Sequence, residues 1–66
     1  MLAQQEIINN AFKELLSHEE MLAKKYADLS KQMTDPQIQK IIQGMEMSSR
    51  TRYRMLTEKM SGFGIN

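Results

Sequence analysis

Apolar side chains recur every three or four residues through the first half of the chain, with a single step of seven. The positions are Ile8, Ala11, Phe12, Leu15, Leu22, Tyr26, Leu29 and Met33. This is the spacing of one face of an α-helix, and no Pro or Gly interrupts it. The pattern predicts a single helix over about residues 4–33, roughly 45 Å long.

The second half of the chain repeats this spacing after a clear start signal. Thr34 or Asp35 can accept a backbone N–H hydrogen bond at a helix start, and Pro36 suits the first helical turn. We therefore predict a turn at 34–36 and a second helix over about residues 37–61. Its apolar positions are Ile38, Ile41, Ile42, Met45, Met55, Leu56 and Met60.

The last five residues, 62–66, are predicted to form a short tail. Gly62 can adopt the left-handed conformation that commonly ends a helix, so it is the expected C-cap. Phe63 and Ile65 are the two large apolar residues of the tail. We expect them to fold back on the helix ends near Ile8 and Phe12.

A short turn between two long helices makes them antiparallel neighbours, so residues whose numbers sum to about 71 should face each other. Residues 1–66 then form a single all-α domain, an antiparallel two-helix hairpin. Two helices cannot cover both sides of their apolar stripes, and a hairpin of this size usually needs a partner. We predict that it dimerises into a four-helix bundle. The predicted oligomer core is Ile8, Phe12, Leu15, Leu22, Tyr26, Leu29, Ile38, Ile41, Ile42, Met45 and Leu56.

Composition narrows the function classes. Nine Lys and Arg against eight Asp and Glu leave a net charge of +1, which argues against a dedicated nucleic-acid binder. The absence of Cys excludes disulfides, thiolate metal sites and thiol catalysis. No apolar run approaches the ~20 residues of a membrane span, and the start does not resemble a signal peptide. We expect a cytoplasmic protein that is not an enzyme and has no nucleic-acid, membrane or small-molecule partner.

Both apolar stripes become polar at the same level. Glu19 fills the step of seven in the first helix, while Ser48, Ser49 and Arg52 fill the corresponding interval in the second. An unpaired charge in a bundle interior is very costly, so a carboxylate and a guanidinium at one level need each other. We predict a Glu19–Arg52 ion pair with Ser49 as a hydrogen-bond partner. The alternative is that both long side chains extend along the helices into solvent.

Several segments resemble the two-helix unit of the ferritin-like superfamily, in particular the small spore coat proteins of the coat protein F type. They are Leu15-Leu16-Ser17-His18-Glu19-Glu20, Tyr26, Thr34-Asp35-Pro36, Ile41-Ile42, Tyr53 and Met60-Ser61-Gly62-Phe63-Gly64. The resemblance covers about residues 10–66 and implies a ferritin-like four-helix bundle. It also implies a non-enzymatic structural protein of the spore coat that assembles with itself and with other coat-type proteins.

The same resemblance implies that the metal site of the superfamily is lost. Ferritin-like sites take one Glu from the first helix and a Glu-x-x-His from the second. Glu19 matches the first Glu, but the second motif falls on Ser49 to Arg52 and neither ligand is present. Arg is permanently cationic and cannot coordinate a metal, so no metal and no cofactor are expected.

Two alternatives stay open. One is a ferritin-like protein that binds metal through Glu19, His18 and Glu46 across an oligomer. The other is a binding module that recognises a helix of a partner in a groove lined by some of the seven Met residues.

Overall fold

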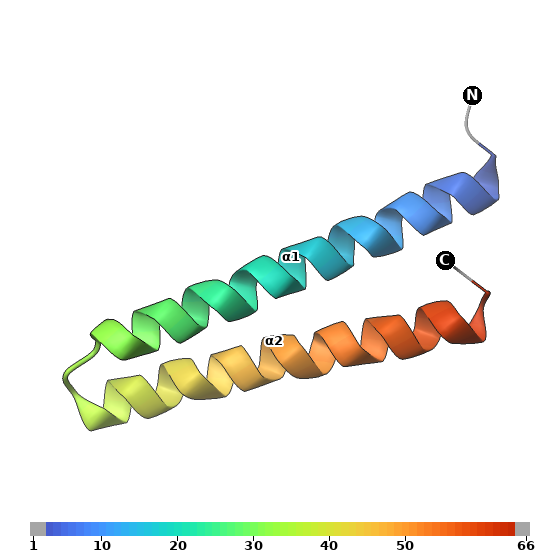
Figure 1. Ribbon diagram of the computed structural model, residues 1–66. Coiled ribbons are helices and arrows are strands. Elements are labelled where there is room, and N and C mark those ends of the chain that lie inside the picture. The colour runs from blue at the N-terminus through green and yellow to red at the C-terminus, as the bar shows by residue number, and fades with distance from the viewer. Residues whose placement is uncertain (1–2, 65–66) are drawn as a thin grey trace.

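The computed structural model of the protein describes residues 3–64. Two helices, α1 (Gln4–Gln32) and α2 (Pro36–Gly62), run antiparallel, with the turn at one end of the molecule and both termini at the other (Figure 1). The described part of the chain contains no strand. The predicted all-helical hairpin is therefore confirmed. No helix in residues 3–64 combines the length and the apolar character of a membrane span.

The turn is fixed by the residue that precedes α2. Asp35 is the N-cap, and its Oδ1 accepts hydrogen bonds from the backbone N–H of Gln37 at 2.8 Å and of Ile38 at 3.4 Å. Pro36 occupies the first helical position, where its missing N–H leaves no hydrogen bond unmade. Of the two predicted candidates, Thr34 and Asp35, Asp35 is therefore the N-cap of α2.

The end of α1 is tied to the start of α2 through a single carbonyl oxygen. Ser30 O accepts from the backbone N–H of Met33 at 3.3 Å and from Nε2 of Gln39 at 3.0 Å. The last carbonyls of a helix lack intrahelical partners, so a side chain from the next helix satisfies one of them. This contact closes the hairpin at the turn.

The end of α2 differs from the prediction. Gly62 is the last helical residue, and the glycine with a positive φ is Gly64, at 68°. The helix continues past the expected position because the backbone N–H of Phe63 still donates to Lys59 O at 3.0 Å. The predicted left-handed Gly62 is therefore wrong by two residues.

Phe63 lies at the open end of the hairpin, where it lines a shallow hollow with Gln5, Ile8 and Phe12. Its ring is still 74% exposed, so the fold covers little of it. Ile65, expected to pack beside it, lies outside the described residues.

The interface between the helices is built on small side chains. Ala23 is 2% exposed and Ser49 is 0% exposed, while Ser30 and Met60 are the other buried residues among those described. Small residues let two helices approach closely, and this shifts the large apolar residues to one side of the interface. Ala23 is not part of the main apolar stripe of α1, yet it lies at the centre of the interface.

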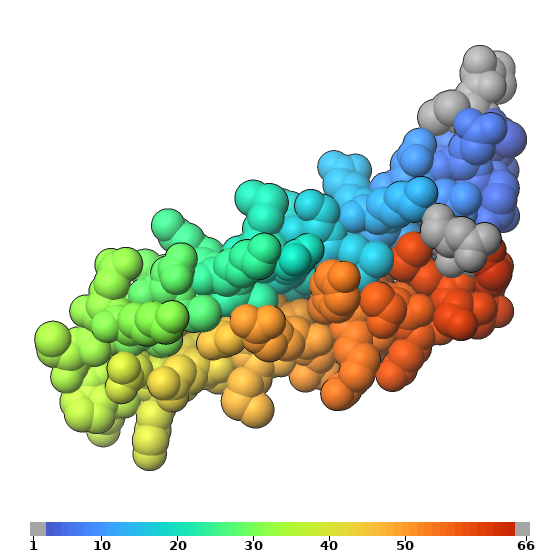
Figure 2. Space-filling model, viewed as in Figure 1, coloured from blue at the N-terminus to red at the C-terminus, as the bar shows by residue number. Residues whose placement is uncertain are grey.

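The hairpin is therefore a single layer of two helices lying side by side (Figure 2). Its Cα atoms extend over 49 × 23 × 12 Å, so the molecule is thinnest across the layer. A layer this thin leaves both broad faces open, so which residues line each face decides what the molecule can do.

Candidate functional site

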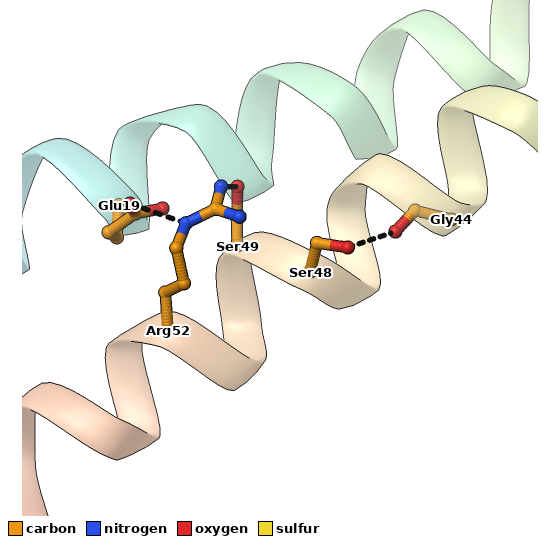
Figure 3. A network of polar contacts seen from close by, with 5 residues as sticks. All are labelled: Glu19, Gly44, Ser48, Ser49 and Arg52. Carbon is orange, nitrogen blue, oxygen red and sulfur yellow. Dashed lines mark hydrogen bonds and ion pairs between the residues drawn. The ribbon is translucent and has the colours of Figure 1, made fainter.

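An ion pair joins the two helices near their midpoints. Nε of Arg52 on α2 donates to Oε1 of Glu19 on α1 at 2.8 Å (Figure 3). Nη2 of the same guanidinium donates to Oγ of Ser49 at 3.1 Å. Ser49 and Arg52 are three residues apart and share one face of α2, so the buried hydroxyl holds the guanidinium beside the carboxylate. The structure brings together the three residues of the predicted polar level.

The two partners of the ion pair differ in exposure. The Glu19 side chain is 17% exposed and the Arg52 side chain is 51% exposed. Oε2 of Glu19 is buried and accepts no hydrogen bond from the described residues. The carboxylate therefore points into the hairpin, while about half of the Arg52 side chain stays accessible.

The pKa of Glu19 lies below its ordinary value. The main cause is the hydrogen bond from Arg52, whose charge also favours the carboxylate, and the Ser49 hydroxyl contributes less. Partial burial acts in the opposite direction but is weaker than the hydrogen bond. The same hydrogen bond raises the pKa of Arg52. Both groups are therefore held in their charged forms at neutral pH.

Large apolar side chains flank the ion pair along the hairpin. On the side toward the termini, Leu15, Met55 and Leu56 line a hollow together with Glu19 and Arg52. On the side toward the turn, Tyr26, Ile41 and Met45 line a second hollow that also reaches Arg52. The ion pair thus lies between two apolar clusters on one broad face of the hairpin.

Helical spacing adds further residues to this surface, which we call the apolar face. Its members are Leu15, Leu22, Tyr26, Leu29, Met33, Ile38, Ile41, Met45, Met55 and Leu56. Leu15, Ile38, Ile41, Met45 and Met55 are each between 42% and 60% exposed. Exposed apolar surface of this extent is unusual on a soluble monomer.

The opposite broad face is polar. Arg50 pairs with Glu46 at 2.8 Å, and Lys24 pairs with Glu20 at 3.3 Å. These pairs connect residues four apart on one helix, and three of the four side chains are more than half exposed, so each pair contributes little to stability. The two faces of the layer therefore differ sharply in character.

None of the predicted oligomer-core residues is fully buried in the single hairpin. Leu15, Ile38, Ile41 and Met45 are exposed. The remaining members of that set are half-buried, namely Ile8, Phe12, Leu22, Tyr26, Leu29, Ile42 and Leu56. The described residues that are buried are Ala23, Ser30, Ser49 and Met60. Ser49 was predicted at the polar level and Met60 among the apolar positions of the second helix, whereas Ala23 and Ser30 were not among the predicted core residues. The signal available for Ala23 and Ser30 was the small size of their side chains, because small residues permit a close helix contact.

The residues at this level do not fit the metal site of the ferritin-like superfamily. Oε1 of Glu19 is engaged by a guanidinium, and α2 offers a serine and an arginine where two ligands are needed. Glu46, considered with His18 for a site across an oligomer, is itself paired with Arg50. Within residues 3–64, no three His, Asp or Glu side chains gather closely enough to hold a metal ion.

Comparison of the chain with protein-family models, with curated proteins and with solved structures finds no match. The ferritin-like and spore coat resemblance therefore stays a prediction.

Proposed function

We propose that this chain is a non-enzymatic assembly protein whose apolar face pairs with the same face of a second copy to form a four-helix bundle. The observation that carries the proposal is the uncovered apolar face. Of the apolar side chains described, only Ala23 and Met60 are buried. Ten large ones are at least 37% exposed, and five of these ten belong to the apolar face. A chain that leaves so much apolar surface in water needs a second layer.

The accessible surface supports a second layer of matching size. A compact monomer of 7.7 kDa exposes about 4,300 Å². This hairpin exposes 5247 Å². The difference of roughly 900 Å² is close to the ~800 Å² that each partner buries in a stable interface of standard size. One further copy is enough to cover it.

The role of such an assembly follows from what the polar level can do. Glu19, Ser49 and Arg52 are joined by hydrogen bonds and charge, and none of them is poised to attack or protonate a substrate. We infer a structural role, in keeping with the resemblance to small spore coat proteins, in which the spore coat is the site of action. Other coat-type proteins are the further partners that this role implies.

The test is the solution mass measured by light scattering, with metal content determined on the same sample. We expect a mass of at least twice 7.7 kDa at micromolar concentration, and a thermal midpoint that rises with protein concentration. A folded monomer with a concentration-independent midpoint would overturn self-association. Stoichiometric bound metal would overturn the structural role in favour of the metal-binding alternative.

A further inference from the structure

The ion pair occupies a special position along the hairpin. The central residue of α1 is His18, directly before Glu19, and the central residue of α2 is Ser49, one turn before Arg52. When two hairpins stack in register by their apolar faces, the midpoints of the helices of one copy lie against the midpoints of the helices of the other. This holds for either direction of the second hairpin. The ion pair of one copy therefore meets the ion pair of the other.

Two orientations of the second copy are compatible with twofold symmetry. With both turns at the same end, each α1 lies over α2 of the partner. Carboxylates and guanidiniums then alternate around the four helices, so every neighbouring pair of charges is unlike. With the turns at opposite ends, each helix lies over its own counterpart. The two Glu19 carboxylates are then neighbours, and so are the two Arg52 guanidiniums.

The apolar residues do not choose between these orientations, because apolar clusters flank the ion pair on both sides. The charges do choose, since like charges brought together in a dehydrated interface are strongly unfavourable. We propose that the Glu19–Arg52 level fixes the orientation of the dimer, with both turns at the same end and Arg52 of each copy facing Glu19 of the partner subunit. This orientation rests on the self-association proposed above.

The free hydrogen-bonding groups agree with this orientation. A guanidinium carries five N–H donors, and only two of those of Arg52 are used within the hairpin. The half-exposed guanidinium therefore keeps donors for acceptors on the partner subunit. In the opposite orientation, the same donors would face another cation.

A ferritin-like bundle joins its two hairpins by one long crossover, which returns the chain along the bundle and places the turns at opposite ends. The proposed orientation departs from that arrangement.

Spin-label distances on the intact chain separate the two orientations. The protein has no Cys, so Thr34→Cys places a single nitroxide at the exposed turn. Helices pack 8–10 Å apart, so labels at the same end should lie within about 25 Å of each other. Labels at opposite ends would be separated by roughly the length of α1, about 43 Å. Ser61→Cys, exposed near the open end, is a second reporter and should also give a short distance.

The outcomes distinguish this inference from the proposed function. Short distances from both labels support the same-end dimer. A long distance from Thr34→Cys, with a short one in mixed dimers of the two labelled proteins, overturns the orientation and leaves self-association standing. The absence of any intermolecular distance in a sample of monomeric mass overturns both.

A pair of double variants tests whether the charges cause the orientation. Glu19→Leu with Arg52→Met keeps an apolar surface and removes the charges, so both distances should appear in roughly equal amounts. Glu19→Arg with Arg52→Glu keeps the alternation and should retain the short distance alone. If the uncharged variant dimerises with only the short distance, the ion pair does not set the orientation.

Discussion

Met45 and Met47 offer a matched test of the apolar face, because they are the same residue type on the same helix. Met45 belongs to the apolar face and is 44% exposed, whereas Met47 is 69% exposed. Two residues turn a helix by roughly 200°, so the two side chains point in different directions. Glutamine has a similar length but a polar end, so Met45→Gln and Met47→Gln differ mainly in location.

The expected magnitude follows from the exposed fraction of Met45. Full burial of a Met side chain contributes about 1.5–3 kcal/mol, so covering the remaining 44% contributes roughly 1 kcal/mol in each copy. A symmetric dimer contains the substitution twice, and about 2 kcal/mol raises the dissociation constant about 30-fold. Met47→Gln, at a position exposed before and after assembly, should change the dimerisation free energy by less than about 0.5 kcal/mol.

Sedimentation equilibrium over a concentration series measures both dissociation constants directly. Far-ultraviolet circular dichroism at high protein concentration checks that each variant remains helical. If the two substitutions weaken association equally, or if neither does, the apolar face is not the interface and the reasoning fails.

Three further predictions concern the hairpin itself. Asp35→Ala should lower the free energy of unfolding by about 1 kcal/mol in urea titrations, because the N-cap hydrogen bonds are lost, while Asp35→Asn should stay close to the original. Ala23→Leu should cost about 1–3 kcal/mol in the same assay, because the helices must separate to admit the larger side chain; an unchanged midpoint would contradict the close contact. The lowered pKa of Glu19 stabilises the fold above the unfolded-state pKa of about 4.3, and this contribution is lost as the pH falls through the folded-state value. The acid loss of stability should therefore be shallower in Glu19→Gln, and parallel pH profiles of the two proteins would show that the ion pair is absent in solution.

The elements and the register follow from local chemistry that the sequence displays. Asp35 and Pro36 mark the start of α2 because capping and a fixed φ depend on neighbouring residues alone. Once the turn is placed, antiparallel geometry pairs residues whose numbers sum to about 71, and Glu19 and Arg52 obey that sum. Near the turn, Gln39 contacts Ser30, and their numbers sum to 69.

The periodicity of the apolar residues does not predict where within the apolar stripe the two helices touch. A stripe spans a wide arc of the helix surface, and spacing does not say which part of that arc the neighbouring helix touches. Here the contact passes through Ala23 and Ser49, because small side chains permit the closest approach, and the large residues are displaced to one face. The unequal exposure of Glu19 and Arg52 follows from that displacement, so the sequence predicts the pair but not its asymmetry.

The thickness of the hairpin has a consequence for how the chain reaches its final state. A layer whose Cα atoms span only 12 Å has almost no interior, so in the proposed dimer the step that encloses its large side chains is a collision between two chains. The rate of such a step increases with the square of the chain concentration. Dilution should therefore slow refolding and also favour dissociation of the dimer. Chains made at low abundance remain half-covered and open to proteases, because cleavage tracks the population of the open form. The amount of protein in the cell would then show a threshold, because the chain would persist only where synthesis is fast enough for dimerisation to outpace proteolysis.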